Sequence, residues 1–165
     1  EVVKRLRGKK QAAVMDLGCG NGALLLLICQ KLDNVEPFGV DVNADRIAHA
    51  RLLHPQYAQN FHVGDMFTLQ SLWKRKNKYD LVLLMPGRFL EAPSKQGEWL
   101  KKRLSGKCED VLAYAYGDWL RKYDSLAGLV KTAGFIDDGS MENKSLAMKV
   151  VINSEQKAKT VPINQ

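Results

Sequence analysis

Residues 12–22 read Ala-Ala-Val-Met-Asp-Leu-Gly-Cys-Gly-Asn-Gly, and this stretch decides the fold. Its first part, Ala12–Leu17, is largely apolar on both faces, as a central parallel strand requires. The second part, Gly18–Gly22, is a predicted loop whose glycines let the backbone turn sharply and approach a ligand closely. The next residues, Ala23–Leu32, are apolar almost all round and predict a helix buried against the sheet. The free N–H groups at the start of that helix would face the same ligand.

Outward from this stretch, short β-rich runs alternate with longer helical patterns, which predicts βαβ units and a largely parallel sheet. Further strands are expected over Phe38–Val42, Phe61–Gly64, Tyr79–Met85, Asp110–Tyr116, Phe135–Met141 and Leu146–Ile152. Helices are expected over Ala44–Leu53, Met66–Lys74, a part of Ser94–Leu104, and Leu120–Ala133. The last two strands are close enough in sequence to form a hairpin, so they should run antiparallel to each other. The predicted fold class is therefore α/β.

The length and composition are those of one globular domain. The chain has 165 residues, of which 45% are hydrophobic and 26% charged, so it can bury a sizeable core, and disorder as its main state is excluded. We expect a single domain over residues 1–165, with a basic N-terminal segment at 1–11 and a flexible tail at 153–165. The chain begins with Glu1 rather than Met, so the native product is expected to be longer.

The sequence predicts a cytoplasmic protein. Its longest strictly apolar run, Ala23–Cys29, is far shorter than the roughly 18 residues that span a bilayer, and no secretory leader pattern opens the chain. Three cysteines without a CxxC spacing argue against a disulfide framework and against a zinc site. The thiols are therefore expected to be reduced, and no metal is predicted.

The net charge is +7, from 25 Lys and Arg against 18 Asp and Glu, which permits an anionic partner without establishing one. The basic residues cluster just before predicted strands, at Lys4, Arg5, Arg7, Lys9 and Lys10, at Lys74, Arg75, Lys76 and Lys78, and at Lys101, Lys102, Arg103 and Lys107. These are the amino ends of the strands, whereas ligands bind at the carboxyl ends. The carboxyl ends collect mainly acids, namely Asp16, Asp41, Asp45, Asp65, Glu91 and Asp118, with Arg46 and Arg88 beside them. This placement disfavours nucleic acid as a partner and favours solvated basic faces.

Asp41 ends the second predicted strand, about 20 residues after the glycine loop begins. An acidic side chain at that place can accept hydrogen bonds from both hydroxyls of a ribose. Gly18, Gly20 and Ala23 also satisfy the G-x-G-x-x-G/A pattern of dinucleotide sites. These residues alone leave two ligands open, an S-adenosyl compound and a dinucleotide.

Four segments of the chain together carry a family resemblance. In order, they are VMDLGCGNG at Val14–Gly22, FGVDVN at Phe38–Asn43, VGDMF at Val63–Phe67 and DLVLLMP at Asp80–Pro86. Together they resemble the first four motifs of the class I S-adenosylmethionine-dependent methyltransferases, and the likeness runs from about residue 10 to 152. The resemblance implies a doubly wound, seven-stranded, mostly parallel sheet of order 3-2-1-4-5-7-6 with strand 7 antiparallel, in a three-layer sandwich. The closing hairpin separates this family from dinucleotide-binding domains, whose final strand is parallel.

The resemblance also implies S-adenosylmethionine as the cofactor, and Asp16 suits it chemically. The Asp16 carboxylate can face the ammonium or sulfonium group of this cofactor, whereas it would repel the diphosphate of a dinucleotide. In the third motif of the family, the acid at the position of Asp65 reads the adenine amino group. The predicted cofactor-binding residues are Asp16, Gly18, Cys19, Gly20, Asn21, Asp41, Val42, Asn43, Gly64, Asp65, Met66, Met85 and Pro86.

The acceptor side of the site is expected after the fourth and fifth strands, at Met85–Glu91 and Tyr114–Trp119. Methyltransferases that act on amines of bases resemble one another in a D/N-P-P-Y/F motif there, and this chain has Met85-Pro86-Gly87-Arg88 instead. Methylation of a nucleobase amine is therefore disfavoured. Arg88, for an anionic group, and Glu91, as a base, are the predicted catalytic residues. The alternative is that the two side chains pair with each other at i, i+3 on a helical turn.

Other polar and aromatic side chains receive mainly structural interpretations. His49 lies within a predicted helix and His54 precedes a proline, so both are expected at the surface. Cys19 is interpreted as a small packing residue rather than a nucleophile. Trp119 is favoured over Trp99 as a wall of an acceptor pocket because it follows the fifth strand.

The leading hypothesis is an S-adenosylmethionine-dependent methyltransferase acting on an oxygen or nitrogen of a small-molecule acceptor, for example in natural-product tailoring. The alternatives are an RNA or protein methyltransferase, an NAD-dependent oxidoreductase, and a domain that binds the cofactor without turnover. Only 11 residues precede the first predicted strand, so we expect an open acceptor pocket. A longer N-terminal segment, a second copy of the chain or a bulky acceptor would complete it, and no membrane partner is expected.

Overall fold

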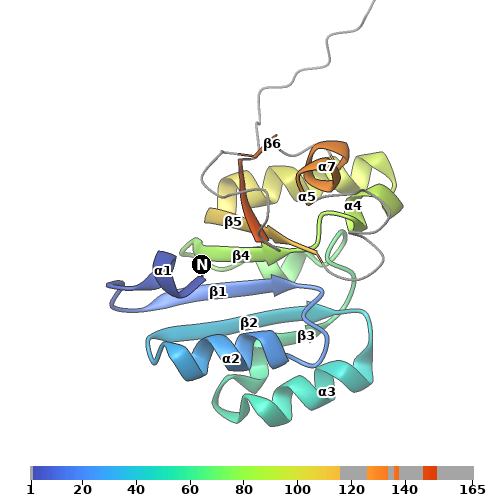
Figure 1. Cartoon of the computed structure of the whole chain (residues 1–165). Helices are drawn as coiled ribbons and strands as arrows, with labels where there is room; N and C mark the ends of the chain where they lie inside the picture. Colours follow the sequence, from blue (N-terminus) through green and yellow to red (C-terminus); the bar gives the residue numbers. More distant parts are fainter. Residues whose placement is uncertain (1, 116–125, 134–135, 138–146, 152–165) are drawn as a thin grey trace, which may run out of the picture.

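A computed structural model describes residues 2–115, 126–133, 136–137 and 147–151 (Figure 1). Its strands are β1 (Ala12–Leu17), β2 (Val35–Asp41), β3 (Phe61–Val63), β4 (Tyr79–Leu84), β5 (Cys108–Tyr114), β6 (Ile136–Asp137) and β7 (Ala147–Val151). Its α-helices are α1 (Val2–Leu6), α2 (Ala23–Lys31), α3 (Ala44–Leu53), α4 (Arg88–Glu91), α5 (Ser94–Lys107) and α7 (Leu126–Thr132). The 3-10 helices η1 (Pro55–Asn60) and η2 (Gln70–Trp73) precede β3 and β4.

Strands β3, β2, β1, β4 and β5 form a parallel sheet in that order, which confirms the α/β class and the predicted order 3-2-1-4-5. In the central ladders, Asp16 of β1 lies opposite Gly39 of β2 and Leu83 of β4. Beyond β5, strand β7 pairs antiparallel with β5, and β6 pairs antiparallel with β7. Because β1, β2, β4 and β5 are parallel, the loops that follow them meet at one end of the sheet.

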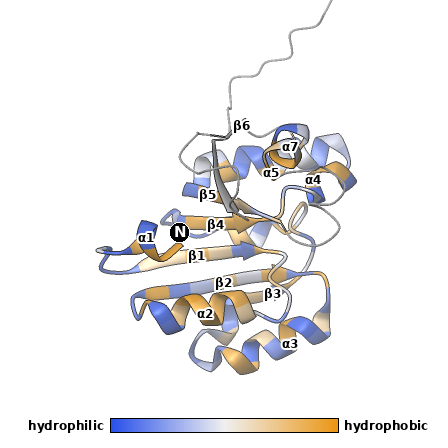
Figure 2. Cartoon of the chain, viewed as in Figure 1, coloured by the Kyte–Doolittle hydropathy of each residue, from blue (hydrophilic) through white to orange (hydrophobic). Residues whose placement is uncertain are grey.

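The side chains of β1 alternate between two buried cores, one on each face of the sheet. Ala13, Met15 and Leu17 belong to a core that includes residues of η2, α4, α5 and α7. Ala12 and Val14 belong to a second core with residues of α1, α2 and α3. Burial on both faces explains why most residues of β1 and β4 are apolar, and Figure 2 shows orange stretches on these strands.

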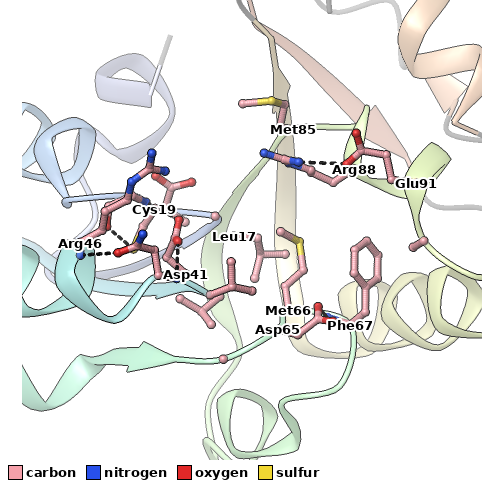
Figure 3. A pocket seen from close by; sticks show the side chains of 18 of the residues that line it. Leu17, Cys19, Asp41, Arg46, Asp65, Met66, Phe67, Met85, Arg88 and Glu91 are labelled. Atoms are coloured by element: carbon pink, nitrogen blue, oxygen red, sulfur yellow. Dashed lines mark hydrogen bonds and ion pairs between the residues drawn. The ribbon is translucent and has the colours of Figure 1, made fainter.

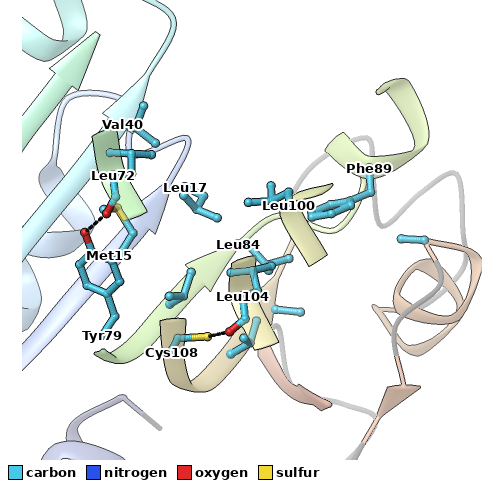
Figure 4. Close-up of a cluster of buried hydrophobic side chains, with 14 of the residues drawn as sticks. Met15, Leu17, Val40, Leu72, Tyr79, Leu84, Phe89, Leu100, Leu104 and Cys108 are labelled. Atoms are coloured by element: carbon cyan, nitrogen blue, oxygen red, sulfur yellow. Dashed lines mark hydrogen bonds between the residues drawn. The ribbon is translucent and has the colours of Figure 1, made fainter. Parts of the chain in front are cut away.

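The first of these cores contains several leucines among other apolar residues. Figure 4 shows part of it, in which Leu84 of β4 meets Leu100 and Leu104 of α5. All three leucines are fully buried. Truncation of a buried leucine to alanine typically costs about 2–5 kcal/mol, so this contact fixes α5 against the strand that ends at the site.

Most element boundaries lie within three residues of the predicted ones, with β2 beginning three residues and β5 two residues earlier than expected. Strand β1 and helix α3 begin and end at the predicted residues. The predicted helix over Met66–Lys74 is wrong, since only the 3-10 turn η2 forms there. The Asp65 side chain accepts the N–H of Phe67 at 2.9 Å, and such a local turn competes with helix formation. The predictions for 116–125, 138–146 and 152–165 lie outside the described residues.

Helix α2 is less buried than the sequence suggests. It buries Leu25 and Ile28 against the sheet. Leu24 and Leu27, one turn apart on the other side, are 38% and 58% exposed. The prediction of a helix buried against the sheet therefore holds for one face only, because in the described structure the other face of α2 is exposed.

Charged side chains at the amino ends of the strands form ion pairs. The Lys9 Nζ lies 2.6 Å from an oxygen of Asp80 on β4 and 2.7 Å from one of Glu109 on β5. Arg75, before β4, pairs with Glu36 of β2 at 3.1 Å. These contacts tie the basic segments to other strands of the sheet, since Lys9 precedes β1 and Arg75 precedes β4. Among the described residues, no helix combines the length and the apolar character needed to cross a bilayer.

Candidate cofactor and active site

The loop between β1 and α2 is built on glycines with positive φ. Gly18, Gly20 and Gly22 have φ angles of 86°, 55° and 76°, a region that other residues rarely adopt. The loop is held to β2 because the N–H groups of Gly18 and Cys19 both donate to the carbonyl oxygen of Val40, at 2.9 Å each. A Cβ at Gly20 would meet no protein atom within 4 Å. The backbone at Gly20 therefore faces open space and forms a cradle for a ligand.

Asp41 closes this loop from the end of β2. Its Oδ2 accepts the N–H of Gly20 at 2.9 Å, and its Oδ1 accepts the N–H of Asn43 at 2.9 Å. Asn43 in turn caps α3, since its Oδ1 accepts the N–H of Arg46 at 3.0 Å. A carboxylate offers about four acceptor positions, so Asp41 retains capacity for a ligand while it holds the loop.

Asp16 is the buried acid of the site. It lies at the carboxyl end of β1, and 1% of the residue is exposed. The Tyr114 hydroxyl, from the end of β5, donates a hydrogen bond to Asp16 Oδ1 at 3.1 Å. Burial raises the pKa of the Asp16 carboxyl to about 7; the Tyr114 hydrogen bond opposes this effect and the nearby Asp41 charge adds to it. A buried carboxylate with few partners is suited to a cationic group.

The loop after β3 forms a third wall of the site. Asp65 lies at the rim, and Met66 lines the cavity beside it. Phe67 is buried behind them and packs edge-on against Phe89 of α4, with ring centroids 5.2 Å apart. Met85, directly after β4, also lines the cavity and adds a second apolar side chain (Figure 3).

Together these walls enclose a pocket of about 1070 Å³ at the carboxyl ends of the strands (Figure 3). Most of the residues predicted from the sequence line it, namely Asp16, Gly18, Cys19, Gly20, Asn21, Asp41, Val42, Asn43, Gly64, Asp65, Met66, Met85, Arg88 and Glu91. Pro86 does not line it. Pro86 is buried and begins the turn into α4, where its carbonyl oxygen accepts the N–H of Phe89 at 3.0 Å.

Arg88 and Glu91 lie on α4 at the side of the pocket opposite Asp41 (Figure 3). Their side chains form an ion pair, with Arg88 Nη1 2.9 Å from Glu91 Oε2. Both are about half exposed, at 53% and 55%. The pairing that the sequence left as an alternative is therefore present, and it places a dipole rather than two separate charges at the pocket wall.

Several pocket residues have no clear signal in the sequence. Tyr114 was expected only as part of an acceptor loop, and its bond to Asp16 joins residues 98 positions apart. His49, expected at the surface, is exposed and also lines the pocket from α3, next to Arg46. Gln96 of α5 lines the pocket as well. His49 and Gln96 are far apart in the sequence, and no pattern in it links them. Only the fold brings α3 and α5 to the same pocket.

His54 and Cys19 have structural roles. The surface prediction for His54 is wrong, since the residue is 3% exposed, stacks on Phe61 at 4.9 Å and places Nε2 3.1 Å from the carbonyl oxygen of Gly22. Burial raises the pKa of the Cys19 thiol far above its usual range. This agrees with packing and not with a nucleophilic thiolate. Among the described residues, no group of three or more His, Cys, Asp or Glu side chains is placed to hold a metal ion.

The donors and acceptors of the pocket suit an S-adenosyl compound. A ribose has hydroxyl donors for Asp41, and the methionine part of the compound carries an ammonium group and a sulfur-centred charge for Asp16. The glycine loop leaves room beside Gly20 that any Cβ would enter. Exposed Val42, at 71%, and Met66 offer apolar surface for an adenine ring. A dinucleotide would instead bring its diphosphate against Asp16 and Asp41.

A family comparison agrees with this reading of the pocket. The profile described as "Methyltransferase domain" matches residues 8–111, which contain β1 to β4 and most of the pocket. The chain belongs to the methyltransferase domain family. The family uses S-adenosylmethionine as its cofactor. No curated protein sequence matches this methyltransferase domain.

Solved structures share the fold of this methyltransferase domain. A TehB-like SAM-dependent methyltransferase from Corynebacterium glutamicum is 14% identical with a TM-score of 0.58, and the match covers 90% of this chain and 83% of that one. WbdD is 18% identical with a TM-score of 0.58, over 92% and 38% of the two chains. The plantazolicin methyltransferase BpumL, in complex with S-adenosylhomocysteine (SAH), is 22% identical with a TM-score of 0.51, over 68% and 42%. The chain thus spans less than half the length of two of these three relatives.

Proposed function

We propose that the chain transfers the methyl group of S-adenosylmethionine to an oxygen or nitrogen of a small-molecule acceptor. One observation carries this proposal: two buried acids, Asp16 and Asp41, line the same pocket as the glycine loop at the carboxyl end of the sheet. When bound, the cofactor supplies a methyl group on a sulfonium. As the methyl group passes to the acceptor, the sulfur becomes a neutral thioether, a leaving group that needs no proton. The chain therefore has to bind, orient and hold its two substrates in line.

In this proposal the cofactor residues divide by the part of the cofactor that they hold. Asp41 accepts hydrogen bonds from the ribose hydroxyls while it also holds the N–H of Gly20. Asp16 faces the ammonium and sulfonium side. Val42 and Met66 pack against the two faces of the adenine ring. Asp65 at the rim accepts a hydrogen bond from the adenine amino group. Gly18, Cys19, Asn21, Asn43, Gly64 and Met85 complete the surface, and Pro86 shapes it from behind through the turn into α4.

The acceptor side is proposed to lie along α4 and the end of β5. There the Arg88–Glu91 ion pair can separate when an acceptor arrives, Arg88 toward an anionic group and Glu91 toward a proton that the acceptor must lose. An exposed ion pair is worth only about 0–1 kcal/mol, so its opening costs little. A small acceptor is supported by the plantazolicin methyltransferase among the relatives in fold.

We also propose that residues 1–165 form one doubly wound domain whose complete sheet has seven strands in the order 3-2-1-4-5-7-6, within a three-layer sandwich in the cytoplasm. The pairing of β7 with β5 supports this architecture. A second copy of the chain, or a segment preceding residue 1, is proposed to cover the acceptor side, because no described residue of α1 lines the pocket.

Methyl transfer tests this function directly. The protein is incubated with S-adenosylmethionine labelled in the methyl group and a panel of alcohols, phenols, amines, carboxylic acids, RNA and unfolded protein, and label is followed into each class. We expect transfer to small molecules that is lost in Asp41→Ala. Transfer to RNA or protein alone would favour the alternative macromolecular acceptor. Cofactor binding without transfer to any class would favour a domain that only binds.

A further inference from the structure

Tyr114 links the acceptor side of the pocket to the buried acid on the cofactor side. It is the last residue of β5, and Asp16 is the next-to-last residue of β1. Strand β4 lies between these two strands in the sheet. Both side chains lie on the sheet face covered by α2, since Tyr114 packs against the core that contains Val14 and Leu83. The Tyr114 side chain therefore spans the width of β4 to reach Asp16 Oδ1 at 3.1 Å.

Among the described residues, few groups donate hydrogen bonds to the Asp16 carboxylate, although it is deeply buried. Within the part of the chain that the structure describes, the Tyr114 hydroxyl is the one group that donates to it. Buried carboxylates normally have more partners, and each missing donor makes the ionised form less favourable. The bond engages Oδ1, no described group donates to Oδ2, and Asp16 is one of the residues that line the pocket.

We propose that Tyr114 is a positioning residue that holds Asp16 ionised and directs its Oδ2 to the ammonium group of the bound cofactor. The proposal rests on the proposed function, since it takes an S-adenosyl compound as the ligand of this pocket. It assigns to a β5 tyrosine a role in cofactor affinity, although Tyr114 comes from the strand that supplies the acceptor side. Loss of the hydroxyl should weaken cofactor binding through the protonation of Asp16.

The surroundings of Asp16 explain why the hydroxyl matters. Asp41 on β2 is a second carboxylate near it, and the Cys19 thiol lies in the loop that follows it. The other charged or titratable groups that line the pocket in the described structure are Asp45, Arg46 and His49 of α3, Asp65 after β3, and Arg88 and Glu91 of α4. Burial raises the pKa of Asp16 to about 7, so its charge depends on pH near neutrality, and the Tyr114 bond favours the charged form.

The test is calorimetric titration of the wild type and of Tyr114→Phe with S-adenosylhomocysteine between about pH 6 and pH 9. Apparent affinity scales with the fraction of protein in which Asp16 is ionised. If the lost bond raises the midpoint by about one pH unit, the variant binds about eightfold more weakly near pH 6.5 and about equally well near pH 9. The titration of the ligand itself is common to both proteins and cancels in the ratio.

Two further variants separate this role from simple packing. Tyr79→Phe removes another buried tyrosine hydrogen bond, from the Tyr79 hydroxyl to the carbonyl oxygen of Leu72 at 2.7 Å, at the opposite end of the sheet. It should lower stability and leave the pH midpoint of binding unchanged. Asp16→Asn should bind weakly with little pH dependence, and Tyr114→Phe in that background should cost little more.

A ligand-free measurement keeps the test independent of binding. Carboxyl-carbon NMR of Asp16 in the wild type and in Tyr114→Phe reports the protonation midpoint directly, and we expect a higher midpoint in the variant. Equal midpoints, or a loss of affinity that is the same at every pH, would overturn the positioning role. If the wild type binds no S-adenosylhomocysteine at any pH while Asp16 still titrates with a Tyr114-dependent midpoint, the cofactor assignment fails instead, and with it the link to the ammonium group.

Discussion

The two ends of the sheet use acidic side chains in opposite ways. At the amino end, Asp80 accepts the N–H of Ala13 at 2.8 Å and pairs with Lys9 at 2.6 Å. At the carboxyl end, Asp41 also accepts backbone N–H groups, yet within the described structure no cation pairs with it or with Asp16. Acids at the first end are neutralised within the protein. At the second end, backbone N–H groups hold Asp41 and the Tyr114 hydroxyl holds Asp16, and both acids are left for a ligand to neutralise.

Some of the basic side chains have partners within the protein. At the amino end, Lys9, Arg75 and Arg5 each pair with an acid. The pocket at the other end is lined by five acids, Asp16, Asp41, Asp45, Asp65 and Glu91. A ligand with a cationic centre is therefore favoured there, whatever the net charge of the chain.

The largest expected effect on cofactor binding comes from comparing a glycine at the amino end of the sheet with one at the carboxyl end. Gly8 and Gly20 both have positive φ, of 89° and 55°, and an added Cβ at either meets no protein atom within 4 Å. Gly8→Val and Gly20→Val therefore carry similar backbone strain. We expect Gly20→Val to abolish binding of S-adenosylhomocysteine and Gly8→Val to retain it, as measured by calorimetry on folded protein. Normal binding by Gly20→Val would mean that the loop has only a structural role.

The next largest effect comes from comparing Asp41, at the carboxyl end of the sheet, with Asp80, at the amino end. Asp41→Ala removes a buried charged acceptor, and hydrogen bonds to charged groups are worth about 1.5–3 kcal/mol. We expect affinity for S-adenosylhomocysteine to fall at least about tenfold. Asp80→Ala should lower the unfolding temperature and leave affinity within about twofold. Asp41→Asn retains an oxygen for the N–H of Gly20, so a smaller loss in this variant separates the loop contribution from the ribose contribution.

Stability should respond to pH through Asp16. The unfolded carboxyl ionises near its ordinary pKa of 3.8, whereas the folded one has a pKa raised to about 7. Between these values the unfolded state releases a proton that the folded state keeps, so stability falls as pH rises. The full difference is on the order of 4 kcal/mol above pH 7 as an upper limit. Asp16→Asn should therefore raise the unfolding temperature at pH 8 by several degrees but not at pH 4, in thermal scans at both values. An equal shift at both pH values would contradict this account.

The smallest effect concerns two exposed ion pairs. Arg88–Glu91 lines the pocket, and Lys101–Glu98 has the same i, i+3 spacing on α5, outside the pocket. Each pair should contribute only about 0–1 kcal/mol to stability, so Arg88→Ala and Glu98→Ala should have similar unfolding temperatures. We expect Arg88→Ala, and not Glu98→Ala, to raise KM for the acceptor in transfer assays. Equal KM values would remove α4 from the acceptor site.

The sequence predicts the cofactor half of the site better than the acceptor half, for a physical reason. Glycines with positive φ and an acid at the end of the next strand are local requirements, so Gly18, Gly20 and Asp41 are visible in a short stretch. The Tyr114–Asp16 bond depends on strand order and on which face each side chain takes, and neither is written in any one segment. His54 shows the same limit, since only the tertiary fold brings it against Gly22 and Phe61.

The central claim is that Asp16 and Asp41, at the carboxyl end of the sheet, select an S-adenosyl compound. Its most direct test is calorimetric titration of the wild-type chain with S-adenosylhomocysteine and, separately, with NAD at the same pH and salt concentration. We expect saturable binding of S-adenosylhomocysteine at one site, weakened in Asp41→Ala, and much weaker or no binding of NAD. Tighter binding of NAD, or affinity for S-adenosylhomocysteine that is unchanged in Asp41→Ala, would contradict the account.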